Sequence, residues 1–211
     1  LDDTVIVFTS DHGEFLGDYN CFGKRAMLDA ASRIPMLVRW PGRRRGGRVC
    51  DTPVSLVDVM PTLLGAAGIG AEGLDLDGED LGAIADGAGA DRTVYSQHSR
   101  GADGLHMAVN RRWKYIWSAA DRREFLFDRA GDPDETRSRG QLPLCRDVVR
   151  AMRANLMDRY RTRGHTEDLD GERWRLYDQP AVPADPDAWL LRQDHPWAEA
   201  KRAIPGYTDE A

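Results

Sequence analysis

TVIVFTSDHGE, at residues 4–14, carries the strongest structural pattern in this sequence. Residues 4–9 are an uninterrupted run of mostly β-branched side chains, without the polar alternation of a strand that has one face in water. This pattern predicts a strand covered on both faces, as in a parallel sheet flanked by helices. Asp11 and His12 follow at the end of the strand, which is where ligands of open α/β sheets bind. The stretch therefore predicts an α/β fold with a candidate site at this strand end.

The residues that follow are consistent with an α/β unit. Residues 34–40 form a second extended run that ends at a Pro-Gly turn. Residues 55–68 predict a helix, with Pro61 in its first turn and Gly68 as its left-handed stop. Residues 70–92 are rich in Gly, Asp and Ala, and we expect a surface loop there with one helical turn.

The pattern changes after residue 92. Short β-like runs separated by turn residues predict an antiparallel meander, with strands at residues 93–97, 106–110, 113–117 and 124–127. A helix should cover this sheet, because apolar or aromatic side chains recur at every fourth position: Leu144, Val148, Met152, Leu156 and Tyr160. Together these elements predict a small α+β layer made of an antiparallel sheet and one helix.

We therefore expect three parts along the chain. Residues 1–92 form the α/β part and residues 93–164 form the α+β subdomain. Residues 165–211 show little periodicity and many Trp and Pro residues, so we expect an irregular tail pinned to the surface by its aromatic side chains.

Composition and charge exclude several classes of protein. The chain has 211 residues, of which 41% are hydrophobic and 30% charged, the balance of a globular protein with a core. Its net charge of −6 gives no indication of a nucleic-acid binder. The sequence has no apolar run long enough to span a membrane. Its three cysteines form no C-x-x-C pair and leave the cellular compartment open.

A set of motifs, in order over residues 4–160, resembles the second half of the catalytic domain of type I sulfatases, which belong to the alkaline phosphatase superfamily. The motifs are TSDHGE at 9–14, Gly23-Lys24, RIPMLVRWPG at 33–42, SLVDVMPTLL at 55–64, WKYI at 113–116, EFLFD at 124–128 and DPDET at 132–136. The resemblance implies the C-terminal part of an alkaline-phosphatase-like, mostly parallel sheet with helices, followed by the small α+β subdomain.

The resemblance also assigns roles to three residues. Asp11 and His12 are expected to be metal ligands, and Lys24 a catalytic residue that contacts the sulfate. The family usually binds Ca²⁺, although a nitrogen ligand also suits Mn²⁺ or Zn²⁺. His98 is a weaker candidate for substrate binding, and an exposed turn histidine is the alternative interpretation.

The family's nucleophile is a formylglycine made from Cys or Ser, and its motif is not found in this sequence. Cys21 has an Arg at the expected spacing, but Gly23 stands where the motif needs Pro, Ala or Ser. We therefore expect the formylglycine upstream of residue 1. The chain begins with Leu and not with Met. It is expected to be a C-terminal fragment that is inactive alone, of unknown compartment and oligomeric state.

The resemblance implies hydrolysis of a sulfate monoester, carried by a small molecule or a carbohydrate. An alternative in the same superfamily is a phosphonate monoester hydrolase or phosphodiesterase, which can share the Asp-His and Lys pattern. A second alternative is a non-catalytic module that retains the fold and lacks the chemistry.

Overall fold

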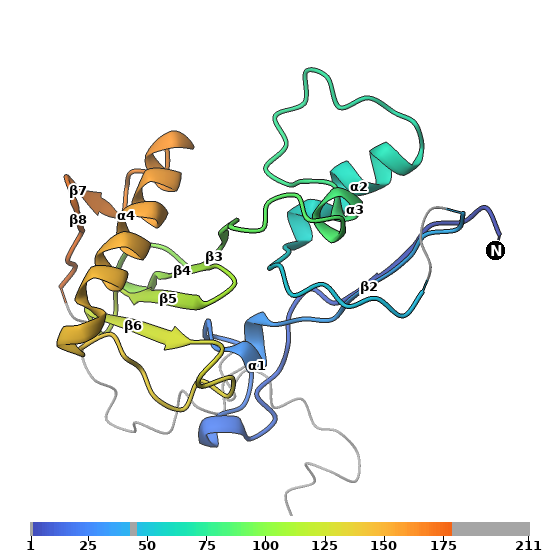
Figure 1. Cartoon of the computed structure of the whole chain (residues 1–211). Helices are drawn as coiled ribbons and strands as arrows, with labels where there is room; N and C mark the ends of the chain where they lie inside the picture. Colours follow the sequence, from blue (N-terminus) through green and yellow to red (C-terminus); the bar gives the residue numbers. More distant parts are fainter. Residues whose placement is uncertain (1, 43–45, 179–211) are drawn as a thin grey trace, which may run out of the picture.

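The computed structural model describes residues 2–42 and 46–178 (Figure 1). The predicted tail therefore lies outside the described residues from position 179 onward. In the part of the chain that the structure describes, no helix combines the length and the apolarity needed to cross a bilayer.

The N-terminal part is built on two short strands, β1 (Ile6–Thr9) and β2 (Met36–Arg39). They pair antiparallel, with Thr9 opposite Met36. The parallel pairing expected for the first strand is therefore wrong among the described residues. The reason lies in the connection, which holds only the 3-10 turn η1 (Asp18–Asn20) and the single-turn helix α1 (Asp29–Ser32). A parallel crossover needs a longer helix packed on the sheet.

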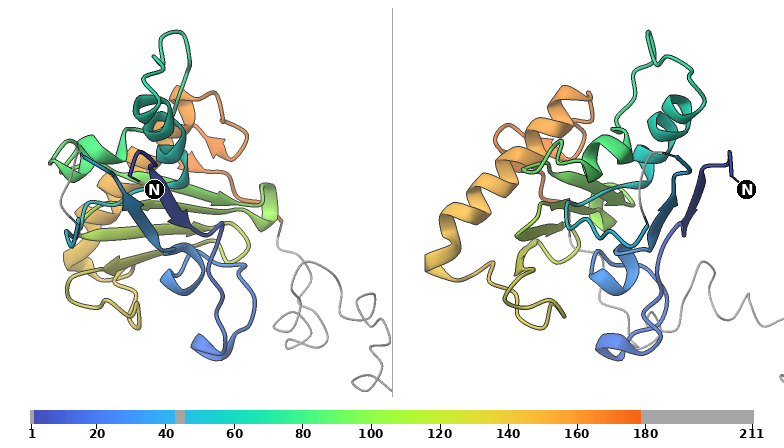
Figure 2. Two further views of the ribbon diagram at one scale, coloured as in Figure 1. Left: turned by 90° about the vertical axis from the view of Figure 1, so that its right-hand side faces the viewer. Right: turned by 45° about the vertical axis from the view of Figure 1, so that its right-hand side comes forward.

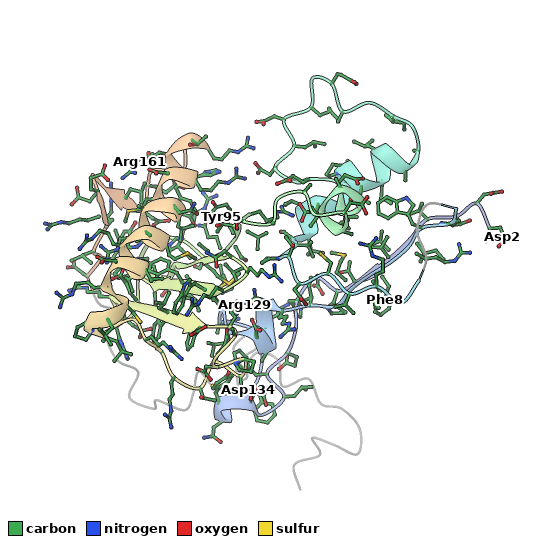
Figure 3. All side chains as sticks on the ribbon, in the orientation of Figure 1. Asp2, Phe8, Tyr95, Arg129, Asp134 and Arg161 are labelled. Carbon is green, nitrogen blue, oxygen red and sulfur yellow. The ribbon has the colours of Figure 1, made fainter. Side chains whose placement is uncertain are left out.

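Of the two covered faces expected for this strand, only one is covered by the described residues. Phe8 is 61% exposed and its cross-strand partner Leu37 is 60% exposed, and Figure 3 labels Phe8 at the outer side of the ribbon. The opposite face packs against a small cluster around Trp40, Leu81 and Ile84. Apolar side chains project from both faces of this strand, but the described residues pack against only one face.

The helix predicted at residues 55–68 is confirmed as the 3-10 turn η2 (Leu56–Asp58) followed by α2 (Val59–Ala66). Ser55 and Asp58 form a reciprocal capping box at its start. Gly68 has a φ of 69°, as its predicted role of left-handed stop requires. The expected single helical turn further along is α3 (Leu81–Ala85).

The antiparallel meander is confirmed. Its strands run in the order β3-β4-β5-β6, with the bounds β3 (Val94–His98), β4 (Leu105–Val109), β5 (Trp113–Ser118) and β6 (Arg123–Asp128). A 3-10 turn, η3 (Gly101–Asp103), precedes β4. Figure 2 shows the long helix α4 (Arg146–Thr162) lying across one face of this sheet.

The buried face of α4 differs in part from the predicted one. Its buried side chains are Val149, Met152, Leu156, Met157 and Tyr160. Leu144, predicted to be on this face, is 97% exposed. The reason is that Leu144 belongs to the 3-10 turn η4 (Pro143–Cys145), where the helical period has not begun.

The opposite face of the meander holds a second apolar cluster. It consists of Met27, Val94, Met107, Val109, Ile116 and Phe127. Met27 comes from the N-terminal part and inserts among side chains of all four strands of the sheet. The chain around Lys24 is thereby attached to the meander.

Residues 165–178 are less irregular than expected, because they include the paired strands β7 (Leu169–Asp170) and β8 (Arg173–Trp174). Trp174 is 5% exposed and stacks on both Trp117 and His106. His106 is fully buried, and its Nδ1 lies 2.7 Å from the hydroxyl oxygen of Tyr160. No pattern in the sequence indicates that this histidine belongs to the core.

Burial lowers the pKa of His106, although the nearby carboxylate of Asp168 acts in the opposite direction. In the unfolded chain an imidazole has a pKa of about 6.5. The unfolded state therefore takes up a proton at higher pH than the folded state, so the stabilising contribution of neutral His106 is lost as the pH falls below about 6.5. We expect the free energy of unfolding to decrease over this range in urea titrations.

The matched variants are His106→Phe, which keeps a ring against Trp174, and His165→Phe, at an exposed histidine. The first should lose most of the decrease and the second should keep it. Parallel pH profiles for the wild type and His106→Phe would contradict this assignment.

Candidate functional site

The chain turns sharply after β1, and a glycine allows the turn to lie against α1. The backbone N–H of Gly13 donates to the carbonyl of Ala31 at 2.8 Å. A Cβ at position 13 would stand 2.0 Å from the carbonyl oxygen of Ala30, so only glycine fits this approach. The Ser10 hydroxyl donates to the carbonyl of His12 at 2.7 Å and closes the turn.

His12 presents one ring nitrogen to the candidate site. Its Nδ1 lies 2.6 Å from the carbonyl oxygen of Gly13, so this nitrogen carries the proton and Nε2 has the lone pair that accepts from the Lys24 ammonium. The Nε2 atom lies 2.6 Å from the Nζ of Lys24 and 3.3 Å from Oδ2 of Asp11. The structure thus brings the three residues predicted for the metal and sulfate site to one point.

Asp11 is exposed at the rim of this group. Loss of hydration acts to raise the pKa of its carboxyl group. Hydrogen bonds from the backbone N–H groups of Asp11 and His12, together with the neighbouring imidazole, outweigh this effect, and the pKa is lowered. The side chain is therefore a carboxylate at neutral pH and offers a hard oxygen ligand.

The loop that carries Lys24 is folded back onto the end of β1. A carboxylate oxygen of Glu14 accepts from the backbone N–H of Gly23, and the N–H of Phe15 donates to the Gly23 carbonyl at 2.9 Å. Phe15 is buried beneath this loop. Glu14 therefore holds the residue before Lys24, a role that the sequence pattern did not reveal.

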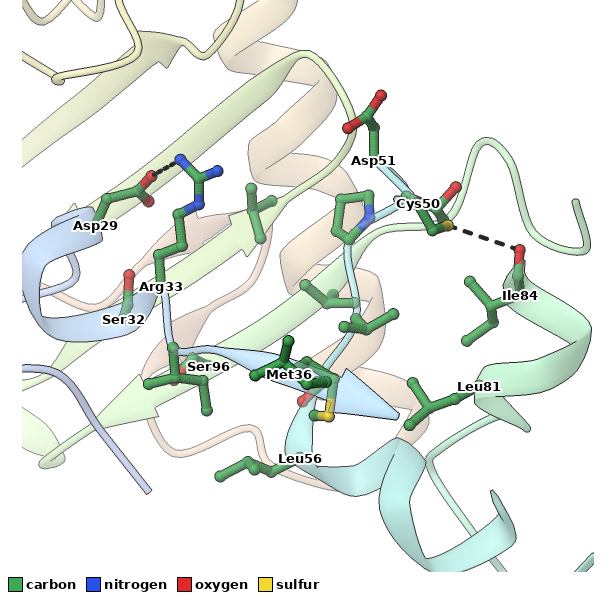
Figure 4. A pocket seen from close by; sticks show the side chains of 18 of the residues that line it. Asp29, Ser32, Arg33, Met36, Cys50, Asp51, Leu56, Leu81, Ile84 and Ser96 are labelled. Atoms are coloured by element: carbon green, nitrogen blue, oxygen red, sulfur yellow. Dashed lines mark hydrogen bonds and ion pairs between the residues drawn. The ribbon is translucent and has the colours of Figure 1, made fainter. Parts of the chain in front are cut away.

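An open cavity of about 1700 Å³ lies beside these residues. Asp11, His12, Lys24 and His98 all contribute to its lining. His98 lines the cavity from β3, a different element from those that carry the other three residues, and it is exposed. Figure 4 shows part of the lining, where α1, β2 and α3 surround the space.

The donor set at residues 11 and 12 fits part of a metal site. A carboxylate oxygen and an imidazole nitrogen lie 3.3 Å apart. The lone pair of that nitrogen accepts from the Lys24 ammonium in this structure, so His12 could bind a metal ion only after the Lys24 side chain turns away. Within residues 2–42 and 46–178, no group of three or more His, Cys, Asp or Glu side chains could hold a metal ion. Asp11 and His12 can therefore serve as two ligands of a set whose remaining members lie elsewhere.

Comparison with known proteins relates this chain to sulfatases. Residues 1–69, which include Asp11, His12 and Lys24, match the family model described as Sulfatase. The chain is also 34% identical over 139 residues to an arylsulfatase of Clostridium perfringens. That match covers 64% of this chain and 29% of the arylsulfatase, so the chain spans less than a third of that relative.

Solved structures show the same fold. BT4656, solved with its substrate D-glucosamine-2-N,6-O-disulfate, superposes with a TM-score of 0.67 at 23% identity, over 79% of this chain and 36% of that one. A phosphonate monoester hydrolase from Silicibacter pomeroyi superposes with a TM-score of 0.63 at 27% identity, over 84% and 40% of the two chains. The expected fold class is thus confirmed at the level of the overall fold, although β1 and β2 pair antiparallel, and the chain is type I sulfatase-like.

Proposed function

We propose that this chain supplies part of the metal and sulfate site of an enzyme that hydrolyses sulfate monoesters. The observation that supports the proposal is the convergence of Asp11, His12 and Lys24 at one point beside a large cavity. The match of residues 1–69 to the sulfatase family model supports the same reaction. The substrate class that we propose is a small-molecule or carbohydrate sulfate ester.

Cleavage of a sulfate ester requires stabilisation of the negative charge that develops on the oxygens around sulfur. The Lys24 ammonium is the group of this chain that would face such an oxygen. At a separation of about 4 Å and an effective dielectric constant of about 20, the attraction between unit charges is about 4 kcal/mol. A few kcal/mol applied to the transition state corresponds to a rate effect of two to three powers of ten, in order of magnitude.

Asp11 and His12 would hold the divalent cation, for which Ca²⁺ is the first candidate and Mn²⁺ or Zn²⁺ the alternatives. A bound cation supplies charge stabilisation to oxygens of the substrate. The hydrogen bond from Nδ1 of His12 to the Gly13 carbonyl fixes the tautomer in which Nε2 could act as the metal ligand. The formylglycine nucleophile has no motif in residues 1–211, and we propose that it is supplied from outside this sequence.

Replacement of Lys24 tests the sulfate contact. In the protein that carries this chain, Lys24→Ala should lower kcat/KM for an aryl sulfate on the order of a hundredfold or more, because a fixed positive charge is lost next to the reacting oxygens. Arg150→Ala is the matched control, since Arg150 is an exposed cation on α4 that pairs only with the exposed Asp147 in the described part of the chain. A loss below about threefold would remove Lys24 from the site.

Removal of Asp11 tests the metal site. We expect Ca²⁺ to raise the Tm of the protein and Asp11→Asn to abolish most of that rise, because a neutral amide is a weaker ligand than a carboxylate. Asp51→Asn is the matched control, since Asp51 is an exposed carboxylate in the lining of the same cavity. The same titration with Mn²⁺ and Zn²⁺ identifies the preferred ion. Equal Ca²⁺ responses in the wild type and both variants would contradict the assignment.

A second candidate function is hydrolysis of a phosphonate monoester or phosphodiester. It is favoured by the likeness to the phosphonate monoester hydrolase, which extends over 84% of this chain at 27% identity. Aryl sulfate and aryl phosphodiester, assayed side by side in the Lys24 experiment, distinguish the two activities by the ratio of kcat/KM. Turnover of neither substrate would favour a non-catalytic module.

A further inference from the structure

A buried lysine connects the meander to the segment that carries Lys24. Lys114 lies on β5 and is 1% exposed. Its Nζ donates to the backbone carbonyl of Met27 at 3.1 Å and to the Ser32 hydroxyl at 3.3 Å. It also pairs with the Asp29 carboxylate. One ammonium group from the sheet thus reaches three positions of the chain shortly after Lys24.

The loop at residues 132–136 holds the same segment from the other direction. Glu135 is 3% exposed, and one of its carboxylate oxygens lies 2.7 Å from the Nζ of Lys114. Its other carboxylate oxygen accepts from the backbone N–H of Asp29 at 2.7 Å.

The preceding residue, Asp134, accepts at its carbonyl from the Tyr19 hydroxyl at 2.5 Å, and Figure 3 labels Asp134 below α1. The loop therefore binds the chain both before and after Lys24.

The loop itself is fixed by Asp132. Its carboxylate accepts from the backbone N–H groups of Thr136 at 3.0 Å and Arg137 at 2.8 Å. These bonds hold the turn in which Glu135 adopts a φ of 52°, an uncommon conformation for a residue other than glycine. The motif DPDET thus has a structural purpose, which is to aim the Glu135 side chain inward.

The contacts of Lys114 and Glu135 also affect His12, because α1 lies between them and the turn that carries His12. Asp29 and Ser32 are the first and last residues of that helix, and the carbonyl of Ala31 accepts from the N–H of Gly13. A shift of α1 would therefore displace both the residue after His12 and the segment that follows Lys24. The 2.6 Å contact between the two side chains depends on where α1 lies.

The polar contacts of Lys114 fix the position of the segment more closely than apolar packing can. The Met27 side chain attaches the segment to the sheet, but apolar contacts are not directional and permit small displacements. A buried lysine, in contrast, requires its carboxylate and carbonyl partners at defined positions, because an unpaired buried charge is costly.

We propose that Lys114 and Glu135 form a clamp that positions Lys24 opposite His12. The two residues are positioning residues and touch no substrate, and the catalytic part of the inference rests on the proposed role of Lys24 at the sulfate. The clamp makes the C-terminal sheet a determinant of the geometry of the candidate site.

The first test measures how firmly residues 23–31 are held, and it needs no substrate. Hydrogen exchange in the protein that carries this chain should show amides 23–31 opening at least about tenfold faster in Lys114→Met than in the wild type, because the buried Glu135 and the partly buried Asp29 lose their cation. Lys114→Arg should restore part of the protection, since it keeps the charge. Leu126→Ala is the control, a core truncation in the cluster beneath α4 that lowers global stability without touching the segment.

Unchanged exchange of amides 23–31 in Lys114→Met would overturn the proposal. So would equal acceleration in Leu126→Ala at matched global stability, because the effect would then be general destabilisation. Neither result bears on whether the protein hydrolyses sulfate esters.

The second test uses kcat/KM for the aryl sulfate. If Lys114 acts through Lys24, Lys114→Met should lower kcat/KM about tenfold or more in the wild type and have almost no further effect in the Lys24→Ala background. Additive losses would contradict positioning through Lys24. Faster exchange together with a wild type that hydrolyses no sulfate ester would refute the proposed function and leave the clamp as a structural feature.

Discussion

The arrangement of this protein depends on the burial of one ammonium group between two parts of the chain that are distant in sequence. Lys114 lies on a central strand of the meander, while Asp29 and Ser32 belong to α1 near the N-terminus. An unpaired charge at this depth would be strongly destabilising, so the two parts must meet in one defined relation. The same helix borders the turn after β1 through the bond from Gly13 to Ala31. The need to pair the buried Lys114 ammonium therefore determines where α1 lies, and α1 borders the point at which Asp11, His12 and Lys24 converge.

Elements that depend on local pattern could be predicted from the sequence, and elements that depend on distant partners could not. Short β-like runs separated by turn residues identified the meander, and the helical period identified α4. Leu144 was wrongly included, because the period of apolar residues does not show where a helix begins. The pairing of β1 was wrong because the run of apolar residues shows how much must be buried, but not which strand lies beside it. Sheet partners are chosen by contacts far apart in the chain.

In the candidate site, too, some residues could be predicted from local sequence motifs and others depend on distant partners. Asp11, His12 and Lys24 were selected because their motifs resemble those of sulfatases, and the structure places their side chains together. Glu14 and Lys114 lie in motifs of the same resemblance, but their roles could not be assigned, because a charged residue in a loop or on a strand has the same sequence pattern whether it is solvated or buried. His106 was missed for a related reason, since its partners Tyr160 and Trp174 come from α4 and β8.

The contact between Lys24 and His12 also limits how the ammonium can act. Nζ lies 2.6 Å from Nε2, so reaching a sulfate oxygen means exchanging one charge-assisted hydrogen bond for another. Such an exchange costs little when the new acceptor is an anion, and the flexible four-carbon stem of lysine permits it without backbone movement. An arginine would be less suited, because its planar fork has a fixed geometry. The proposed sulfate contact would therefore combine a mobile charge with a fixed backbone, and the buried contacts of Lys114 and Met27 would hold that backbone.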